Sequence, residues 1–243
     1  MRLNIVLLPC IVCIDAICYC IIIPEEMTTK AEEDYIKAIY KIADRDRRAV
    51  ATNAIAGQIG TSAASVTDMI KRLSDKKLVN YEKYHGVTLT EDGRALATSL
   101  VRKHRLWEVF LVEKLQFRWN EIHDIAEELE HLDSTELINR LDAYLGFPRF
   151  DPHGDPIPSI EGKFTLRNQV ILAEVQTGTS VTVVGVREHD DSFLTHLDDM
   201  GLSLTRNLEV IEKYGYDDSM LIEVEGTQRT ISSKVSRNIY VKL

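Results

Sequence analysis

Cysteine is almost missing from this chain of 243 residues, because all four of its cysteines lie in the first 20 positions, at Cys10, Cys13, Cys18 and Cys20. No framework of disulfide bonds therefore holds the rest of the chain together. Disulfides are rare in a reducing cytosol, and we expect a cytoplasmic protein. The four thiols stand among apolar residues without other ligand types, which argues against a metal site in this segment.

Two signatures of enzymes are also missing. The chain contains neither an H-E-x-x-H motif nor a glycine-rich loop of the kind that cradles phosphate groups. Both absences argue against a metallohydrolase, and we expect a protein that is not an enzyme. The sequence shows no internal repeat.

A net positive charge is missing too, since the formal charge is −9. By itself this charge argues against a nucleic-acid binder. The charge is uneven, however: residues 28–96 carry two more Lys and Arg than Asp and Glu, whereas residues 97–243 carry nine more acidic than basic residues. A near-neutral to basic module joined to an acidic one is compatible with DNA binding by the first and cation binding by the second.

The first 26 residues are apolar enough to resemble a signal or membrane segment. Pro9 and Asp15 interrupt the apolar run, and it has no A-x-A cleavage pattern. The interpretation we favour is that translation begins at Met27, which would make residues 1–26 dispensable. A membrane anchor is the alternative, and we expect no membrane partner.

A helix-turn-helix pattern follows this leader. Apolar residues between positions 35 and 42 recur at three- and four-residue steps, which indicates an amphipathic helix. A short helix around Ile55 and a longer helix that carries Val66 and Ile70 inward are joined by a turn at Gly60. Two helices joined by a short turn with glycine are typical of a helix-turn-helix motif.

The remainder of the chain predicts strands, then helices, then strands again. Residues 79–89 read as the two strands of a wing. Residues 90–116 and 120–145 are predicted to form two long helices and a shorter third. Four of the six prolines lie between positions 148 and 158, which indicates a linker or an ordered, extended crossover. Short strands separated by turns then predict a small β-barrel.

These elements predict an α+β protein with three folded units. We divide the chain into a leader, a winged helix-turn-helix DNA-binding domain, a helical domain, a proline-rich linker and a small β-barrel. Their respective ranges are 1–26, 27–96, 97–147, 148–164 and 165–243.

The stretch IHDIAEELEH, residues 122–131, gathers candidate metal ligands. Its four candidates, which span about a third of a helix circumference at 100° per residue, are His123, Glu127, Glu130 and His131. His104 and Glu108 form another pair at i and i+4 one helix earlier, and Asp34 is a further candidate in the first helix. Any one of these residues alone is more simply a solvated or capping side chain. Two such helical pairs beside a DNA-binding motif favour a metal site, and carboxylate with imidazole suits Mn²⁺ or Fe²⁺ better than structural zinc.

Six short motifs carry a family resemblance: EDYIKAIY, SAASVTDMIKRL, GVTLTEDG, RKHRLWEVFL, HDIAEELEH and DPHGDPIP. They occur in this order between about residues 28 and 160. Together they resemble the diphtheria toxin repressor family of metal-dependent transcriptional regulators, which includes the manganese transport regulators. Residues 165–243 resemble, more loosely, the SH3-like (FeoA-like) third domain of the longer members. The resemblance implies a homodimer, with residues 97–147 as the metal-binding and dimerisation domain.

The resemblance also implies two metal sites. The primary site would be made from Asp34, Glu127, Glu130 and His131, and the second from His104, Glu108 and His123. Iron-sensing members carry Met and Cys at the positions of Asp34 and Glu127. Oxygen ligands there favour Mn²⁺ as the cofactor, with Fe²⁺ as the alternative.

Two departures from the family pattern bear on these sites. Short manganese regulators carry an acid at the position of Lys37, which puts their closely spaced two-metal geometry in doubt for this chain. Long members supply third-domain ligands, and here the similar position reads HDDS. His189, Asp190 or Asp191 would then reach the second site, and a plain acidic turn is the alternative.

The predicted function is a manganese-responsive repressor of metal-uptake genes that binds double-stranded operator DNA. The residues that the recognition helix would present to DNA are Ser62, Ala63, Ser65, Thr67, Asp68, Lys71 and Arg72. The alternatives are an iron-responsive regulator of the same family, a metallohydrolase, and a winged-helix regulator without metal control.

Overall fold

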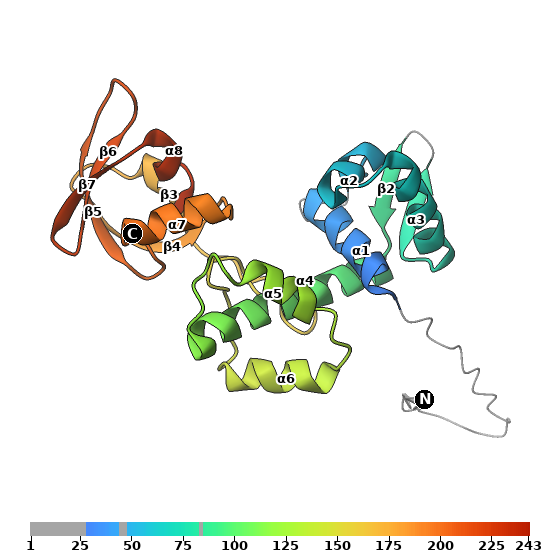
Figure 1. Cartoon of the computed structure of the whole chain (residues 1–243). Coiled ribbons are helices and arrows are strands. Elements are labelled where there is room, and N and C mark those ends of the chain that lie inside the picture. Colours follow the sequence, from blue (N-terminus) through green and yellow to red (C-terminus); the bar gives the residue numbers. More distant parts are fainter. Residues whose placement is uncertain (1–27, 44–47, 83–84) are drawn as a thin grey trace, which may run out of the picture.

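The computed structural model describes residues 28–43, 48–82 and 85–243, arranged as three folded units along the chain (Figure 1). Our predictions for residues 1–26 lie outside the described residues. Within the described part, no helix combines the length and the apolar character needed to cross a membrane.

The N-terminal unit is a winged helix-turn-helix. Its elements are α1 (Lys30–Ile42), α2 (Thr52–Ile59), α3 (Ala63–Asp75), β1 (Val79–Glu82) and β2 (Gly86–Leu89). Thr29 and Glu32 form a capping box at the start of α1, which satisfies backbone N–H groups that a helix leaves unpaired. Gly60 ends α2 with a left-handed φ of 74°, and Ser62 then caps α3. The inward face of α3 packs with α1 in one buried cluster, so the two helices are held together as a unit.

The middle unit is helical, and here the structure corrects the prediction. The long helix α4 (Glu91–Leu115) is capped by the Thr90 hydroxyl, which accepts a hydrogen bond from the backbone N–H of Gly93. Two short helices follow it, α5 (His123–Leu129) and α6 (Thr135–Tyr144), in place of a second long helix. The chain turns between them because Ser134 caps a new helix by accepting a hydrogen bond from a backbone N–H. The candidate ligands at positions 130 and 131 therefore lie in the turn after α5, not on the face of a continuous helix.

The proline-rich segment is an ordered loop, one of the two possibilities predicted for it. The Asp151 carboxylate accepts hydrogen bonds from the backbone N–H groups of His153 and Asp155 and so closes a tight turn. Gly154 has a φ of +88°, and a Cβ there would lie 2.2 Å from the carbonyl oxygen of Val184. Only glycine tolerates this approach, which holds the loop against the C-terminal unit.

The C-terminal unit is a six-stranded antiparallel sheet in the order β3-β8-β4-β5-β6-β7. The strands are β3 (Val170–Ile171), β4 (Ser180–Val186), β5 (Asn207–Lys213), β6 (Met220–Val224), β7 (Thr227–Ile231) and β8 (Ile239–Lys242). Alternating side chains of these strands fill its core. The sequence prediction missed two helices of this unit, α7 (Asp191–Asp199) and the short α8 (Ser233–Ser236).

Candidate metal centre

Three ligand atoms meet between the N-terminal unit and the turn after α5. Nε2 of His131 lies 3.0 Å from Oδ1 of Asp34 and 3.9 Å from Oε1 of Glu130. The ligand atoms of these three residues all lie within 4.8 Å of one another. Asp34 is placed by α1, whereas Glu130 and His131 are placed by the end of α5. The tertiary fold thus brings together three of the four residues predicted for a primary site.

Two of these ligand atoms are buried without a hydrogen bond. In the described part of the chain, Oε1 of Glu130 and Nε2 of His131 have no hydrogen-bond partner. Buried polar atoms are nearly always paired, so an orphaned oxygen and nitrogen that face one another call for a ligand. Burial also raises the pKa of Asp34, although His131 partly offsets the effect. A cation at this point would satisfy all three groups.

The orientation of the His131 ring supports this reading. Its Nδ1 lies 2.6 Å from Oε2 of Glu33, which fits an Nδ1–H that donates to the carboxylate. The unprotonated Nε2 then faces Asp34 and Glu130. Histidine ligands of metals commonly donate their other N–H to a carboxylate in this way. Spacing along the chain did not point to Glu33, because adjacent positions on a helix point in different directions.

Glu127 lies in a neighbouring cluster. The ammonium nitrogen of Lys37 lies 2.8 Å from Oε1 of Glu127, and it also donates to Oε2 of Glu130. Burial by itself raises the pKa of Glu127, but the charge and hydrogen bond of Lys37, with the charges of Lys41 and His104, outweigh this and bring the pKa to about 2. Among the described residues, Glu127 makes its hydrogen bond and ion pairs through Oε1.

The three residues predicted for a second site lie together on α4 and α5. Nε2 of His104 is 3.1 Å from Oε1 of Glu108, and Nδ1 of His123 is 3.9 Å from the same oxygen. Nδ1 of His104 lies 2.7 Å from Oε2 of Glu130, so His104 repeats the arrangement of His131 with a carboxylate behind the ring. Burial lowers the pKa of His104, but hydrogen bonds with Glu108 and Glu130 outweigh burial and raise it.

Sequence reasoning missed two residues that also reach Glu108. Asp151 and His153, from the proline-rich loop, form with Glu108 a buried set of ligand atoms within 4.8 Å of one another. Burial and the nearby Glu108 carboxylate raise the pKa of Asp151 well above its usual range. Two carboxylates this close disfavour joint ionisation, and a divalent cation removes that penalty. The DPHGDPIP motif contains both residues, but only the folded loop shows that they point at α4.

One of the three third-domain candidates reaches this site. The His189 ring stacks on that of His153, with 4.8 Å between ring centroids, and both line a cavity of about 200 Å³ beside His104 and Glu108. Partial loss of water around the ring, together with the neighbouring His153, lowers the pKa of His189, although the residue as a whole is exposed. Asp190 instead caps α7 through its carboxylate, and Asp191 is exposed.

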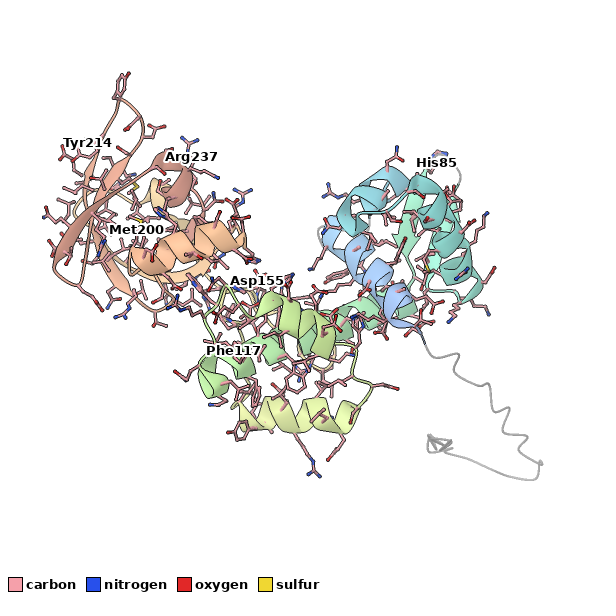
Figure 2. The ribbon with its side chains drawn as sticks, viewed as in Figure 1. His85, Phe117, Asp155, Met200, Tyr214 and Arg237 are labelled. Atoms are coloured by element: carbon pink, nitrogen blue, oxygen red, sulfur yellow. The ribbon has the colours of Figure 1, made fainter. Side chains whose placement is uncertain are left out.

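The same cavity reaches the border between two units. Asp155, which also lines it, lies where the helical unit meets the C-terminal sheet (Figure 2). The potential metal ligands that line the cavity are carboxylate oxygens and imidazole nitrogens, the set that suits Mn²⁺ and Fe²⁺. The described residues therefore offer two places that suit divalent cations. One lies between α1 and the turn after α5, and the other lies around the Glu108 carboxylate.

The predicted recognition helix presents most of its candidate residues to solvent. The exposed ones are Ser62, Ala63, Ser65, Asp68, Lys71 and Arg72, whereas Thr67 is half-buried and donates its hydroxyl hydrogen to the carbonyl oxygen of Ala63. Lys71 pairs with Asp68 at 3.2 Å, an exposed contact that phosphate can displace. In Figure 1, α3 lies on the side of its unit away from the C-terminal sheet.

Comparison with known proteins finds matches over nearly all of the described chain. Residues 27–87 match the "Iron dependent repressor, N-terminal DNA binding domain", residues 90–159 the "Iron dependent repressor, metal binding and dimerisation domain", and residues 170–243 the FeoA domain. The iron-dependent repressor IdeR of Mycobacterium tuberculosis is 32% identical over 182 residues, which cover 70% of this chain and 79% of IdeR. The diphtheria toxin repressor of Corynebacterium diphtheriae is 28% identical over 76% of this chain and 85% of its own length.

Solved structures show the same likeness. A manganese-dependent transcriptional repressor in complex with manganese is 35% identical, with a TM-score of 0.72 over 86% of this chain and 98% of that chain. The manganese regulator SloR is 34% identical, with a TM-score of 0.63 over 87% of this chain and 97% of that chain.

Proposed function

Because the chain belongs to the iron-dependent repressor family of metal-dependent, DNA-binding transcriptional regulators, which are not enzymes, we propose which ion and which residues it uses. The ion is Mn²⁺, with Fe²⁺ as the second candidate. The primary ligands are Asp34, Glu130 and His131, and Glu127 completes the set through Oε2. The observation that carries this assignment is the pair of buried, unpaired atoms on Glu130 and His131 beside the Asp34 carboxylate.

Hard oxygen ligands favour Mn²⁺ at this centre. Asp34 and Glu130 offer carboxylate oxygens, and the cluster holds no thiolate or thioether. Flexible carboxylates can adapt to the six- or sevenfold coordination that hard ions of this kind adopt. Relatives named for manganese and for iron both resemble the chain, so the choice rests on these side chains.

In this proposal, Asp34, Glu130 and His131 all bind the same divalent ion. Asp34 belongs to α1, which packs with the recognition helix α3 in one core, whereas Glu130 and His131 belong to the helical unit. The shared ion therefore fixes the DNA-binding unit against the helical unit. This coupling would set the spacing of two recognition helices to that of two operator half-sites.

We propose Glu108 as the central ligand of a second site. His104 and His123 approach it from the helices, and Asp151 and His153 approach it from the proline-rich loop. His189 adds a ligand from the C-terminal unit. Occupancy of this site would therefore tie the C-terminal sheet to α4.

We propose that the chain acts as a homodimer on operator DNA in the cytoplasm. The helical unit exposes several large apolar side chains, namely Leu132, Leu137, Tyr144 and Phe147. A second copy would cover them, which agrees with the match to a dimerisation domain. The seven residues of the recognition helix named above would then contact successive major grooves.

The test is DNA binding with and without metal. A duplex selected by the protein from random DNA in the presence of Mn²⁺ serves as the operator, and binding is followed by fluorescence anisotropy. We expect binding that requires Mn²⁺, disappears with a chelator and is lost in His131→Ala. Equal binding with and without metal would contradict the proposal.

A further inference from the structure

The Lys37 side chain is buried in the middle of the ligand cluster. Only 4% of its side chain is exposed, although lysine is among the residues least often buried. Its ammonium nitrogen donates to Oε2 of Glu130, lies 2.8 Å from Oε1 of Glu127 and 3.3 Å from Nδ1 of His104. A buried ammonium is costly unless it is paired, and this one is paired with two carboxylates, those of Glu127 and Glu130.

These three partners are themselves a set of metal-ligand type. The ligand atoms of His104, Glu127 and Glu130 lie within 4.8 Å of one another, as those of Asp34, Glu130 and His131 do. Two clusters thus share Glu130. The ammonium of Lys37 contacts every member of the first cluster, whereas the second has unpaired buried atoms on Glu130 and His131.

We propose that Lys37 is a built-in cation that occupies the His104–Glu127–Glu130 cluster and so limits this centre to one divalent ion. The inference rests on the proposed function, in which that ion binds at Asp34, Glu130 and His131. Oε2 of Glu130 serves the lysine, and Oε1 faces the ion.

The charges support this division. Asp34, Glu127 and Glu130 together carry three negative charges, which one ammonium and one divalent ion neutralise. A second divalent ion beside Lys37 would leave a surplus of positive charge in a buried place, where unpaired charge is disfavoured. The lysine thereby excludes a bridged pair of ions, and it also links α1 to α4 and α5 before any metal binds.

Lys41 offers a matched comparison on the same helix. Its ammonium nitrogen lies 3.7 Å from the same oxygen of Glu127, but 44% of its side chain is exposed. Among the described residues, it makes no hydrogen bond or ion pair with Glu130 or His104, the other two members of the cluster. If Lys37 were only a neighbour of the acidic residues, its substitution should have the same effect on metal binding as substitution of Lys41.

The experiment counts tightly bound ions. Wild type, Lys37→Ala and Lys41→Ala are dialysed to equilibrium against Mn²⁺, and bound manganese per chain is measured by mass spectrometry. We expect Lys37→Ala, which opens the lysine's position, to bind one ion more per chain than wild type. Lys41→Ala should bind the wild-type number. Equal counts in Lys37→Ala and wild type would overturn the inference, whereas no manganese on wild type would overturn the proposed function instead.

A second measurement uses the unaltered chain, in case Lys37→Ala does not fold. Crystals of wild type grown with excess Mn²⁺ are measured at the manganese absorption edge. We expect an anomalous peak beside Asp34 and His131 and none between His104 and Glu127. A peak between those two residues would overturn the role of Lys37, and the lack of a peak beside Asp34 and His131 would instead count against the primary site.

Discussion

Glu130→Gln tests the primary site with the least change in shape. Glu130 has no exposed surface, and its two oxygens serve different partners. Oε2 accepts from Lys37, and Oε1 is the buried, unpaired atom that faces His131. Glutamine keeps the volume of the side chain but removes the charge that binds a cation. Alanine would also leave a cavity and remove a hydrogen-bond acceptor of Lys37, so the effect of that substitution would be harder to interpret.

Two free-energy changes can be estimated for this variant: the loss of stability without metal and the loss of stabilisation by bound Mn²⁺. A hydrogen bond to a charged group contributes about 1.5–3 kcal/mol. Oε2 of Glu130 takes part in two, with Lys37 and His104, so the metal-free variant should lose about 3–6 kcal/mol of stability at most. For a chain of this size that lowers Tm by roughly 2–4 °C per kcal/mol. At a Mn²⁺ concentration 100 times the wild-type Kd, bound metal stabilises the protein by about 2.7 kcal/mol. If the affinity falls about 100-fold, that stabilisation shrinks to about 0.4 kcal/mol.

The assay is a thermal unfolding experiment with and without Mn²⁺ at that concentration. Glu128→Gln is the matched control, because Glu128 lies two residues away, has a side chain that is 76% exposed and pairs with the exposed Lys30. We expect the control to keep the full Mn²⁺-induced shift in Tm and Glu130→Gln to lose most of it. A wild-type shift in Glu130→Gln would refute the assignment of Glu130 as a ligand.

Three further predictions address DNA, ion choice and pH. Lys71→Ala should lower the slope of log affinity against log salt by about 0.9, the value for one phosphate contact. Thr67→Ala should instead change the preference among operator sequences. An unchanged slope together with an unchanged preference would contradict the recognition-helix assignment. Asp34→Met replaces a hard oxygen with a thioether, so anaerobic titration of DNA binding should show a shift in response from Mn²⁺ towards Fe²⁺. Because hydrogen bonds to Glu108 and Glu130 outweigh burial and raise the pKa of His104, Mn²⁺ affinity should increase as pH rises through that pKa, and calorimetry that shows a constant affinity from pH 6 to 8 would refute this.

The raised pKa of His104 also has a consequence for the metal-free protein. A histidine whose pKa is higher in the folded state binds its proton more tightly there. Its stabilising contribution is therefore fully present below the unfolded pKa of about 6.5 and is lost as pH rises through the folded pKa. Metal binding and metal-free stability should thus respond to pH in opposite directions.

The local sequence was sufficient for the elements that depend on near neighbours. Helix periodicity indicated α1 and α3, and the glycine turn at Gly60 indicated the helix-turn-helix. These features arise from contacts between residues a few positions apart, which the order of residues already contains. The α+β class followed from them, whereas the family resemblance came from six short motifs; both are confirmed by the fold and the comparisons.

The metal centre depended on contacts across the chain, and there the sequence was only partly informative. The spacing rule for a continuous helix failed at Glu130 and His131 because α5 ends at Leu129, yet both residues still reach their cluster from the turn. Nothing in the local pattern showed that Lys37, 90 positions before Glu127, would place its ammonium among the acids. The residue order alone shows which ligand types are present. Which of them meet depends on the folded chain, because α1, α4 and α5 converge through packing of their apolar faces. That convergence sets which charges must neutralise one another.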